Sequence, residues 1–373
     1  MYLSFFRKYL YPVVVISGSI IGVGFFSLPY VAMKSGIWLT LFYFFILSII
    51  VLTIHLIFAE ISLKTPDFKR FPGFVGFHLG EKWKNFALFS TIISSYAILL
   101  AYLIVGSEFL KNILQPYFGG ESFIYAIIYF SFISAIIWFG IKAVEKVELW
   151  VLCLLFFSII FIFIKSFWQI NISNVFILPT SFSFSNLFLP YGAILFSLWG
   201  VTLIPEAEEM IGKDKRSIKK VVIISTLIPV VFYIFFTFLI LSITGVNTTE
   251  SAFIGLANHL GNFSIIIFFT GMFTTITACI AQGLTLKKVF NYDLKIKKWQ
   301  AFVMTCSVPM ILFLMGFNSF IELISFIGGV LLGINGILIL LIYKKIGGKK
   351  IIIYPLALIF LLGIFYEIIY KLI

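Results

Sequence analysis

Long apolar runs separated by short polar segments most constrain what this chain can fold into. A helix needs about 20 apolar residues to cross a bilayer, and open backbone is not tolerated in lipid. The sequence therefore predicts an all-α polytopic membrane protein with eleven spans. Their approximate ranges are 11–34, 37–63, 86–110, 122–141, 147–166, 187–211, 218–244, 263–287, 299–316, 319–343 and 351–370.

The composition agrees with a membrane protein, because 61% of the residues are hydrophobic and only 11% are charged. About a quarter of the residues in a soluble domain are charged. In a soluble protein the net charge of +12 would suggest a nucleic-acid partner. The three cysteines have neither metal-ligand spacing nor the pattern of a disulfide framework.

The basic residues alternate between loops in a way that predicts orientation. If the N-terminus is cytoplasmic, all but four of the 27 Lys and Arg residues fall on the cytoplasmic side. The exceptions are Lys34, Lys111, Lys165 and Lys371. Cytoplasmic loops of membrane proteins carry an excess of Lys and Arg. We therefore expect a multi-pass protein of the cell (plasma) membrane, with its N-terminus inside and its C-terminus outside, and no nucleic-acid partner.

The first span contains an unusual stretch, 17-SGSIIGVGFFSLP-29. Glycines such as Gly18, Gly22 and Gly24 each cost about 1 kcal/mol relative to alanine in a helix interior. Broken backbone in a bilayer is tolerated only against protein or a water-filled cavity. The stretch predicts a discontinuous helix that binds a ligand, the alternative being close helix packing through small residues.

The sixth span has a matching interruption at 197-SLWG-200, between Pro190 and Pro205. It follows the first span by five helices, so the two spans start on opposite sides of the membrane. Paired broken helices in inverted halves indicate a substrate site near the midplane of a secondary transporter.

These residues resemble the amino acid/auxin permease family, within the amino acid–polyamine–organocation superfamily. The stretch 18-GSIIGVGFFSLPYVAMKSG-36 is similar to that family's first-helix pattern, G-x-x-I-G-x-G-x-x-x-L-P. Three further stretches resemble its third helix, its sixth helix, and its ninth and tenth helices: 101-AYLIVGSEFL-110, 196-FSLWGVTLIPEAEEMI-211 and 316-GFNSFIELISFIGGVLLGINGILILLIY-343.

The resemblance implies a LeuT-like fold within one transmembrane domain, residues 1–373. It would hold two inverted five-helix repeats, at about 11–166 and 187–343, with broken helices 1 and 6. An eleventh helix would follow at about 351–370. The resemblance also implies ion-coupled symport of amino acids by alternating access.

Both charged groups of an amino acid suit the two breaks. The amides of Ile21, Gly22 and Val23 open the outer half of helix 1, where a helix N-terminus attracts a carboxylate. Free carbonyls at 17–19 and 197–199 suit the ammonium group. The predicted substrate-binding residues are Gly18, Ser19, Ile21, Gly22, Val23, Gly24, Tyr102, Ser197, Trp199 and Gly200.

Aromatic side chains near the breaks are candidates for substrate specificity. They are Phe196 and Trp199 on helix 6, and Tyr96 and Tyr102 on helix 3. They favour a neutral or aromatic amino acid as substrate. The alternative is that these side chains face lipid or pack within the protein.

The coupling ion is expected to be Na⁺ or H⁺. A sodium site is predicted at Ser17, Ile20, Thr274 and Thr277, because hard cations take oxygen ligands. Alternatively, these threonines bond back to carbonyls of their own helix.

Titratable groups inside a membrane are candidate functional residues, because they are costly to bury in lipid. For a proton, Glu206 in the inner half of helix 6 is the main candidate, ahead of Glu60, Glu108 and Glu322 near the interfaces. His55, deeper in helix 2, is expected to be a hydrogen-bonded packing residue, the alternative being a proton relay.

Two loops are expected to be ordered. Residues 67–85 mix Phe and Trp with Lys and Arg, which predicts an amphipathic segment on the cytoplasmic interface. Residues 248–260 predict a short outer helix, capped by Thr248 or Thr249 and with Glu250 in its first turn.

A rival function with the same fold is an amino-acid-sensing, germinant-receptor-like permease homologue that binds without net transport. An enzyme is not expected, since the sequence has no G-x-S-x-G or H-E-x-x-H motif. A channel is not expected either, because no charged ring or filter-like repeat is present. The expected partners are a small amino acid and the lipid bilayer, with no cofactor and no obligate protein partner.

Overall fold

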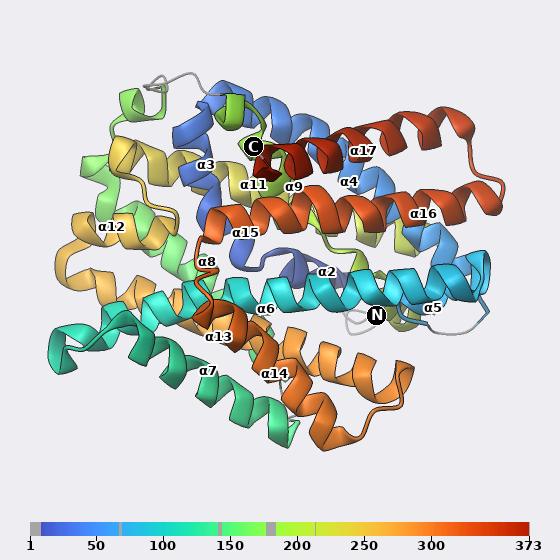
Figure 1. Cartoon of the computed structure of the whole chain (residues 1–373). Coiled ribbons are helices and arrows are strands. Elements are labelled where there is room, and N and C mark those ends of the chain that lie inside the picture. Colours follow the sequence, from blue (N-terminus) through green and yellow to red (C-terminus); the bar gives the residue numbers. More distant parts are fainter. Residues whose placement is uncertain (1–8, 67–68, 141–143, 177–183, 213, 373) are drawn as a thin grey trace, which may run out of the picture.

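The computed structural model describes residues 9–66, 69–140, 144–176, 184–212 and 214–372, which form a bundle of helices lying side by side (Figure 1). The first half contains α2 (Tyr11–Ile20), α3 (Leu28–Ser35), α4 (Ile37–Lys64), α5 (Phe71–Leu79), α6 (Glu81–Phe118), α7 (Ser122–Phe139) and α8 (Val144–Ser166). The second half contains α9 (Phe184–Leu198), α10 (Ile204–Ile211), α11 (Lys215–Thr244), α12 (Ala252–Leu260), α13 (Ser264–Lys288), α14 (Lys298–Leu314), α15 (Phe320–Phe326), α16 (Gly333–Lys345) and α17 (Lys350–Leu372).

The predicted all-α membrane architecture is confirmed. Within the described residues, nine helices are long and apolar enough to cross a membrane, and a bent pair near the N-terminus can supply a tenth span. The predicted span at 299–316 corresponds to α14, which has only 17 residues. The count of eleven spans stays a prediction.

The first span breaks where its glycines predict. Helix α2 ends at Ile20, and Gly22 is extended, with φ −99° and ψ −151°. A short 3₁₀ segment, η2 (Val23–Ser27), leads into α3, whose first turn contains Pro29. Proline suits this position because its missing N–H has no helical partner there. The two helical parts meet at 47°.

The sixth span is interrupted in a similar way. Helix α9 ends at Leu198, and a 3₁₀ turn, η5 (Val201–Leu203), precedes α10. Pro205 lies in the first turn of α10. Trp199 and Gly200 therefore lie between the two helical parts, as predicted.

The tenth predicted span contains a feature that the sequence did not reveal. Between α15 and α16 the backbone forms a π-helical segment, η9 (Ile327–Leu332). This segment packs closely against α9, because a Cβ added at Gly328 would lie 1.9 Å from the carbonyl oxygen of Gly192. Glycine at both positions lets the two backbones touch.

Two predicted boundaries were wrong. Helix α6 begins at Glu81, directly after α5, so part of the predicted interfacial segment 67–85 belongs to a 38-residue helix. Helix α12 starts at Ala252, and its N-cap position is Ser251. The predicted capping by Thr249 is confirmed in part, because Oγ1 of Thr249 accepts a hydrogen bond from the backbone N–H of Gly255 in the first turn over 2.8 Å. Glu250 lies before this helix, and its carboxylate accepts a hydrogen bond from the backbone N–H of Ile321.

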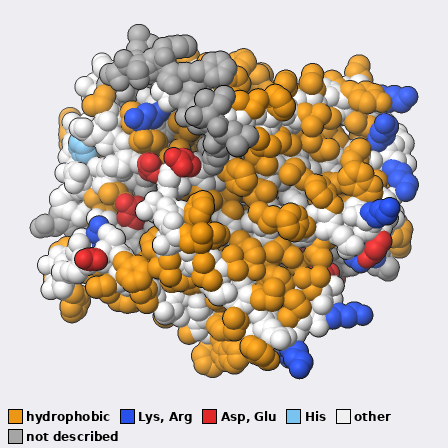
Figure 2. Space-filling view, in the orientation of Figure 1, with side chains coloured by type: hydrophobic (Ala, Val, Ile, Leu, Met, Phe, Trp, Pro, Cys, Tyr) orange, Lys and Arg blue, Asp and Glu red, His pale blue; other side chains and the backbone are white. Residues whose placement is uncertain are grey.

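The surface has the pattern of a membrane protein (Figure 2). Apolar side chains cover the middle of the face shown, and basic side chains gather at its right-hand end. In Figure 1 the turn between α16 and α17 lies at this end, and its residues Lys344, Lys345, Lys349 and Lys350 are exposed. A basic end is expected to face the cytoplasm.

Candidate functional site

The two breaks lie against each other at the centre of the bundle. A Cβ added at Gly24 would lie 2.5 Å from Oγ of Ser197 and 2.9 Å from Cδ1 of Phe196. A Cβ added at Gly200 would lie 2.4 Å from Cγ1 of Ile20. Any larger residue at Gly24 or Gly200 would push the broken helices apart. The glycines therefore allow the interrupted segments to meet.

Tyr233 of α11 joins the two broken helices. Its hydroxyl lies 2.7 Å from the carbonyl oxygen of Ile20, where α2 ends, and 3.0 Å from that of Ser197, near the end of α9. The side chain is fully buried, and its ring stacks on Phe25. A phenol has one proton to donate, so only one of the two carbonyls can accept it at a time.

His55 of α4 supports the break in the sixth span from the other side. Its Nε2 accepts a hydrogen bond from the backbone N–H of Gly200 over 3.1 Å. Its Nδ1 lies 2.9 Å from Oγ1 of Thr226 on α11. The imidazole is fully buried. The expectation of a hydrogen-bonded His55 is confirmed, and its partners are the broken helix and α11.

Tyr102 of α6 points at the break in the first span. A Cβ added at Gly22 would lie 2.9 Å from its hydroxyl oxygen. The Tyr102 side chain is buried, and it is near enough to Tyr233 to interact electrostatically with it. The structure thus brings the predicted residues Gly22 and Tyr102 together.

Two of the three backbone amides predicted to bind the carboxylate already donate hydrogen bonds within the protein. The N–H of Ile21 donates to the carbonyl of Ser17 over 2.9 Å, and that of Gly22 donates to the carbonyl of Ile20 over 2.8 Å. A carboxylate bound here would have to replace these two bonds. Ser19 donates to the carbonyl of Ile16, within its own helix, and Gly18 has open space around it.

An apolar wall borders the break in the sixth span. Phe196 and Trp199 pack against a small buried cluster made by Ala97 of α6 and three residues of η9. Those residues are Ile327, Leu331 and Leu332. The ring of Trp199 also meets His55 edge to face, at 6.5 Å between centroids. Tyr96 lies elsewhere, because its hydroxyl donates to the carbonyl of Met304 on α14.

Each of the four predicted sodium ligands takes part in a hydrogen bond within the protein in this structure. Ser17 donates to the carbonyl of Ser225 on α11, and Ile20 accepts from Tyr233 of the same helix. Thr274 and Thr277 donate to carbonyls within α13, those of Thr270 and of Phe273 and Thr274. Backbonding of this kind was the alternative expectation for membrane threonines. The sodium site stays a prediction.

Glu206 lies in the first turn of α10, and its Oε2 is buried without a hydrogen-bond partner among the described residues. The cations of Arg70 and Lys288 are near enough to interact with it electrostatically. Arg70 also pairs with Asp293, at 3.5 Å. The second half of the sixth span, α10, therefore lies in a group of charged side chains from several elements.

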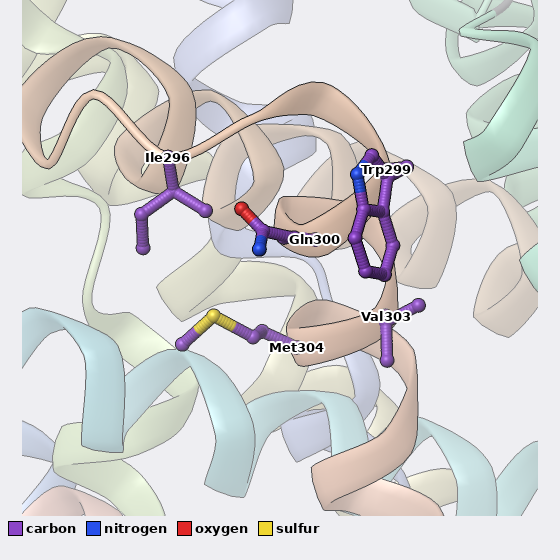
Figure 3. Close-up of a pocket in the computed structure, with 5 residues that line it drawn as sticks. All are labelled: Ile296, Trp299, Gln300, Val303 and Met304. Carbon is purple, nitrogen blue, oxygen red and sulfur yellow. The ribbon is translucent and has the colours of Figure 1, made fainter.

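A shallow groove lies along the start of α14 (Figure 3). In sequence, it is far from the two helix breaks. Its lining consists of Ile296, Trp299, Gln300, Val303 and Met304. No charged side chain lines it, and none of the predicted substrate-binding residues does so. We do not assign the substrate to this groove.

Tyr233 was not among the residues predicted from the sequence. His55 was predicted only as a packing residue, not as a partner of the broken helix. The chain has 17 Tyr and 47 Phe residues, so one more aromatic residue in an apolar helix gives no local signal. The sequence feature that points to Tyr233 is a hydroxyl group in the middle of an apolar span, at the depth of the two helix breaks.

Comparison with known proteins decides the family. The sequence matches the model of the tryptophan/tyrosine permease family over residues 6–357. The chain belongs to this family. No curated protein matches this sequence. The match assigns a family that the sequence resemblance did not name, and membership of the wider superfamily stays a prediction.

The chain is also similar to solved structures of the same fold. It is similar to MhsT in complex with L-phenylalanine, with a TM-score of 0.68 and 13% identity, covering 96% of this chain and 98% of that one. It is also similar to Mhp1, a nucleobase-cation-symport-1 family transporter, in a closed conformation with bromovinylhydantoin bound. That match has a TM-score of 0.62 and 12% identity, covering 96% of this chain and 90% of that one.

The predicted LeuT-like fold is therefore confirmed. The family and the similar structures identify a multi-pass membrane transporter rather than an enzyme. The exact division into five and five helices, and the role of an eleventh, stay predictions.

Proposed function

We propose that this permease is an ion-coupled symporter of aromatic amino acids in the cell membrane. The observation that carries this proposal is the junction of the two broken helices, where the carbonyls of Ile20 and Ser197 converge on one hydroxyl. The family's name, tryptophan/tyrosine permease, supports the substrate class. A bound L-phenylalanine in the similar MhsT structure supports it further.

The substrate ammonium is proposed to bind where Tyr233 now bridges the breaks. An ammonium has three protons to donate, whereas the phenol has one. It can satisfy the carbonyls of Ile20 and Ser197 together and release the hydroxyl of Tyr233. The carboxylate would then take the amides near Gly22, at the start of the outer half of the first span.

The side chain of the substrate is proposed to lie on the apolar wall formed by Phe196 and Trp199. An aromatic ring gains from burial there and from edge-to-face contact with these rings. Neighbouring residues of η9 and α6 are all aliphatic, namely Ala97, Ile327, Leu331 and Leu332. Such a wall would not favour a charged side chain.

Alternating access is proposed to come from movement of the half-helices around the junction. The ion is Na⁺ at the oxygens of Ser17, Ile20, Thr274 and Thr277, or H⁺ at a carboxylate such as Glu206. The buried, unpartnered oxygen of Glu206 supports the second choice. The basic end of the bundle is proposed to face the cytoplasm, which places the N-terminus inside and the C-terminus outside.

The test is uptake of radiolabelled tryptophan and tyrosine into proteoliposomes, with Na⁺ and pH gradients imposed separately. Accumulation under one gradient supports symport and identifies the ion. Binding of tryptophan without uptake or exchange would instead favour the amino-acid-sensing alternative. Absence of both binding and uptake for every aromatic amino acid would contradict the proposed substrate class.

A further inference from the structure

A buried carboxylate lies in the last helix, at a position that the sequence analysis did not single out. Glu367 of α17 is only 3% exposed and continues the buried face of this helix, which also holds Phe360 and Gly363. It lies roughly 25 Å along the helix from Lys350, at about 1.5 Å per residue. This places it within the apolar span Lys350–Ile369, near the end that lies opposite the basic turn.

Glu367 packs into a notch made by the π-helical segment η9. A Cβ added at Gly329 would lie 2.4 Å from Cγ of Glu367 and 3.3 Å from its Oε1. The absence of a side chain at Gly329 is therefore what makes room for the carboxyl group. Segments of π-helix inside α-helices are frequently found at functional sites.

The same face of α17 also holds the outer half of the sixth span. The ring of Tyr191 of α9 lies over Gly363, one turn before Glu367, and a Cβ at Gly363 would meet this ring at 2.2 Å. The hydroxyl of Tyr191 approaches the carbonyl of Ile359 at 3.5 Å. Glu367 is also close enough to Tyr191 to interact with it electrostatically.

Glu367 thus packs against η9 and lies near Tyr191 of α9, and these two elements meet at the proposed substrate site. Segment η9 supplies Ile327, Leu331 and Leu332 to the apolar wall, and α9 ends at the Ser197 carbonyl. A buried carboxylate is costly to keep charged, so the burial of Glu367 in this notch points to a function. A change of charge on Glu367 would alter the packing of both elements at once.

We propose that Glu367 is a proton-binding site, and that its protonation couples a pH gradient to movement of α9 and η9. This inference rests on the proposed function of the chain as an ion-coupled transporter. The proton comes from the outer solution and leaves to the cytoplasm as the site changes its exposure. No other group is oxidised, reduced or transferred.

Titratable groups of neighbouring elements lie near Glu367. On α9 the group is the phenol of Tyr191, and Tyr43 of α4 interacts in turn with that phenol. Segment η9 contributes only Ile, Gly, Val and Leu. Tyr366 adjoins Glu367 in sequence but stacks on Phe188 of α9.

The experiment uses purified full-length protein in proteoliposomes, with radiolabelled tryptophan as the probe. Two assays are compared: accumulation under an imposed pH gradient, acid outside, and counterflow without a gradient. In Glu367→Gln we expect gradient-driven accumulation to fall to the level without a gradient, while counterflow persists. Glu121→Gln removes an exposed carboxylate before α7 and serves as the control, with both activities unchanged.

Glu367→Asp keeps a titratable group and guards against a folding defect in the glutamine variant. We expect it to retain proton-driven uptake with a shifted pH dependence. Unimpaired gradient-driven accumulation in Glu367→Gln would overturn the proposal. An unchanged pH profile in Glu367→Asp would also overturn it, as would equal loss of counterflow in both variants.

The outcome for the unmodified protein separates this inference from the proposed function. Tryptophan counterflow together with no accumulation under an imposed pH gradient would leave transport intact but reject Glu367 as the coupling site. Failure to bind or exchange any aromatic amino acid would instead reject the proposed function itself.

Discussion

The backbone N–H of Gly200 donates a hydrogen bond to Nε2 of His55, 3.1 Å away. Because Nε2 accepts this bond, the proton of the neutral imidazole is assigned to Nδ1, which lies 2.9 Å from Oγ1 of Thr226. Thr226 in turn donates to the carbonyl of Val222. One histidine therefore ties the break in the sixth span to α4 and α11.

Replacing His55 by phenylalanine is expected to destabilise the protein. The ring volume is roughly kept, but the buried N–H of Gly200 loses its acceptor, at a cost of about 1–3 kcal/mol. We expect thermal unfolding of the purified protein to shift down by several degrees. Thr53→Val is the control, since Thr53 lies on the same helix and bonds only to its own backbone, at Ile49. Equal unfolding temperatures for the two variants would contradict the role of His55.

Replacing Tyr233 by phenylalanine is expected to strengthen substrate binding. The change removes the hydroxyl that competes with the substrate ammonium for the carbonyls of Ile20 and Ser197, and keeps the ring stacked on Phe25. One hydrogen bond is worth about 0.5–1.5 kcal/mol net, so the Kd for tryptophan should fall by up to about tenfold. Equilibrium binding of radiolabelled tryptophan measures this. Much weaker binding would mean that the hydroxyl itself holds the substrate.

Gly22→Val is expected to abolish tryptophan uptake while leaving expression intact. A Cβ at this position would lie 2.9 Å from the hydroxyl oxygen of Tyr102, and the branched side chain would fill the space where the carboxylate is proposed to bind. Uptake in whole cells, normalised to protein in the membrane, measures this. Normal uptake by the variant would show that the break in the first span is not part of the substrate site.

A milder pair of changes tests the same contact through stability. Gly22→Ala should lower the unfolding temperature, because the added methyl group meets the Tyr102 hydroxyl. Adding Tyr102→Phe to that variant removes the obstructing oxygen and should recover part of the loss. Additive destabilisation by the two changes would show that they do not share this contact.

The positions of the helix breaks could be predicted from the sequence, because helix stability at these points depends on the residues at the break itself. Three glycines around Gly22, and Gly200 followed by Pro205, weaken helices wherever they stand. Most helix boundaries fell within a few residues of the observed ones, whereas the orientation predicted from the charge pattern stays a prediction. Tyr102 was foreseen beside Gly22 only through the family resemblance.

The partners of the breaks could not be predicted in this way, because they depend on tertiary packing. Tyr233 and His55 reach the breaks from α11 and α4, and nothing near them in sequence marks the contact. Glu367 was overlooked since its burial depends on the notch at Gly329. The π-helical segment that forms this notch has no local sequence rule comparable to a proline or a cap.

Glu250 gives a prediction for pH dependence outside the membrane-spanning segments. Burial raises the pKa of its carboxyl group, and the nearby Glu322 raises it further. The N–H of Ile321 and the cation of Lys34 act in the opposite direction. A carboxyl group with a raised pKa binds its proton more tightly in the folded than in the unfolded state. Its contribution to folding stability therefore improves as the pH falls through the folded-state pKa.

Glu250→Gln is expected to remove this pH-dependent part of the stability while keeping an acceptor for the N–H of Ile321. Unfolding temperatures of the unmodified protein and the variant, measured from about pH 4 to pH 8 around the ordinary carboxyl pKa, should converge at low pH. Above the folded-state pKa the variant should be the more stable of the two. A constant difference across the range would show that this carboxyl group does not titrate differently on folding.

Tryptophan counterflow in proteoliposomes tests the central claim most directly. Vesicles containing the purified protein are loaded with unlabelled tryptophan and diluted into a trace of radiolabelled tryptophan without any ion gradient. The account predicts a transient accumulation of label that needs the protein and the internal tryptophan, and that is lost in Gly22→Val. Binding of the label with no such exchange would contradict the account, because it would make the paired breaks a receptor site rather than a transport site.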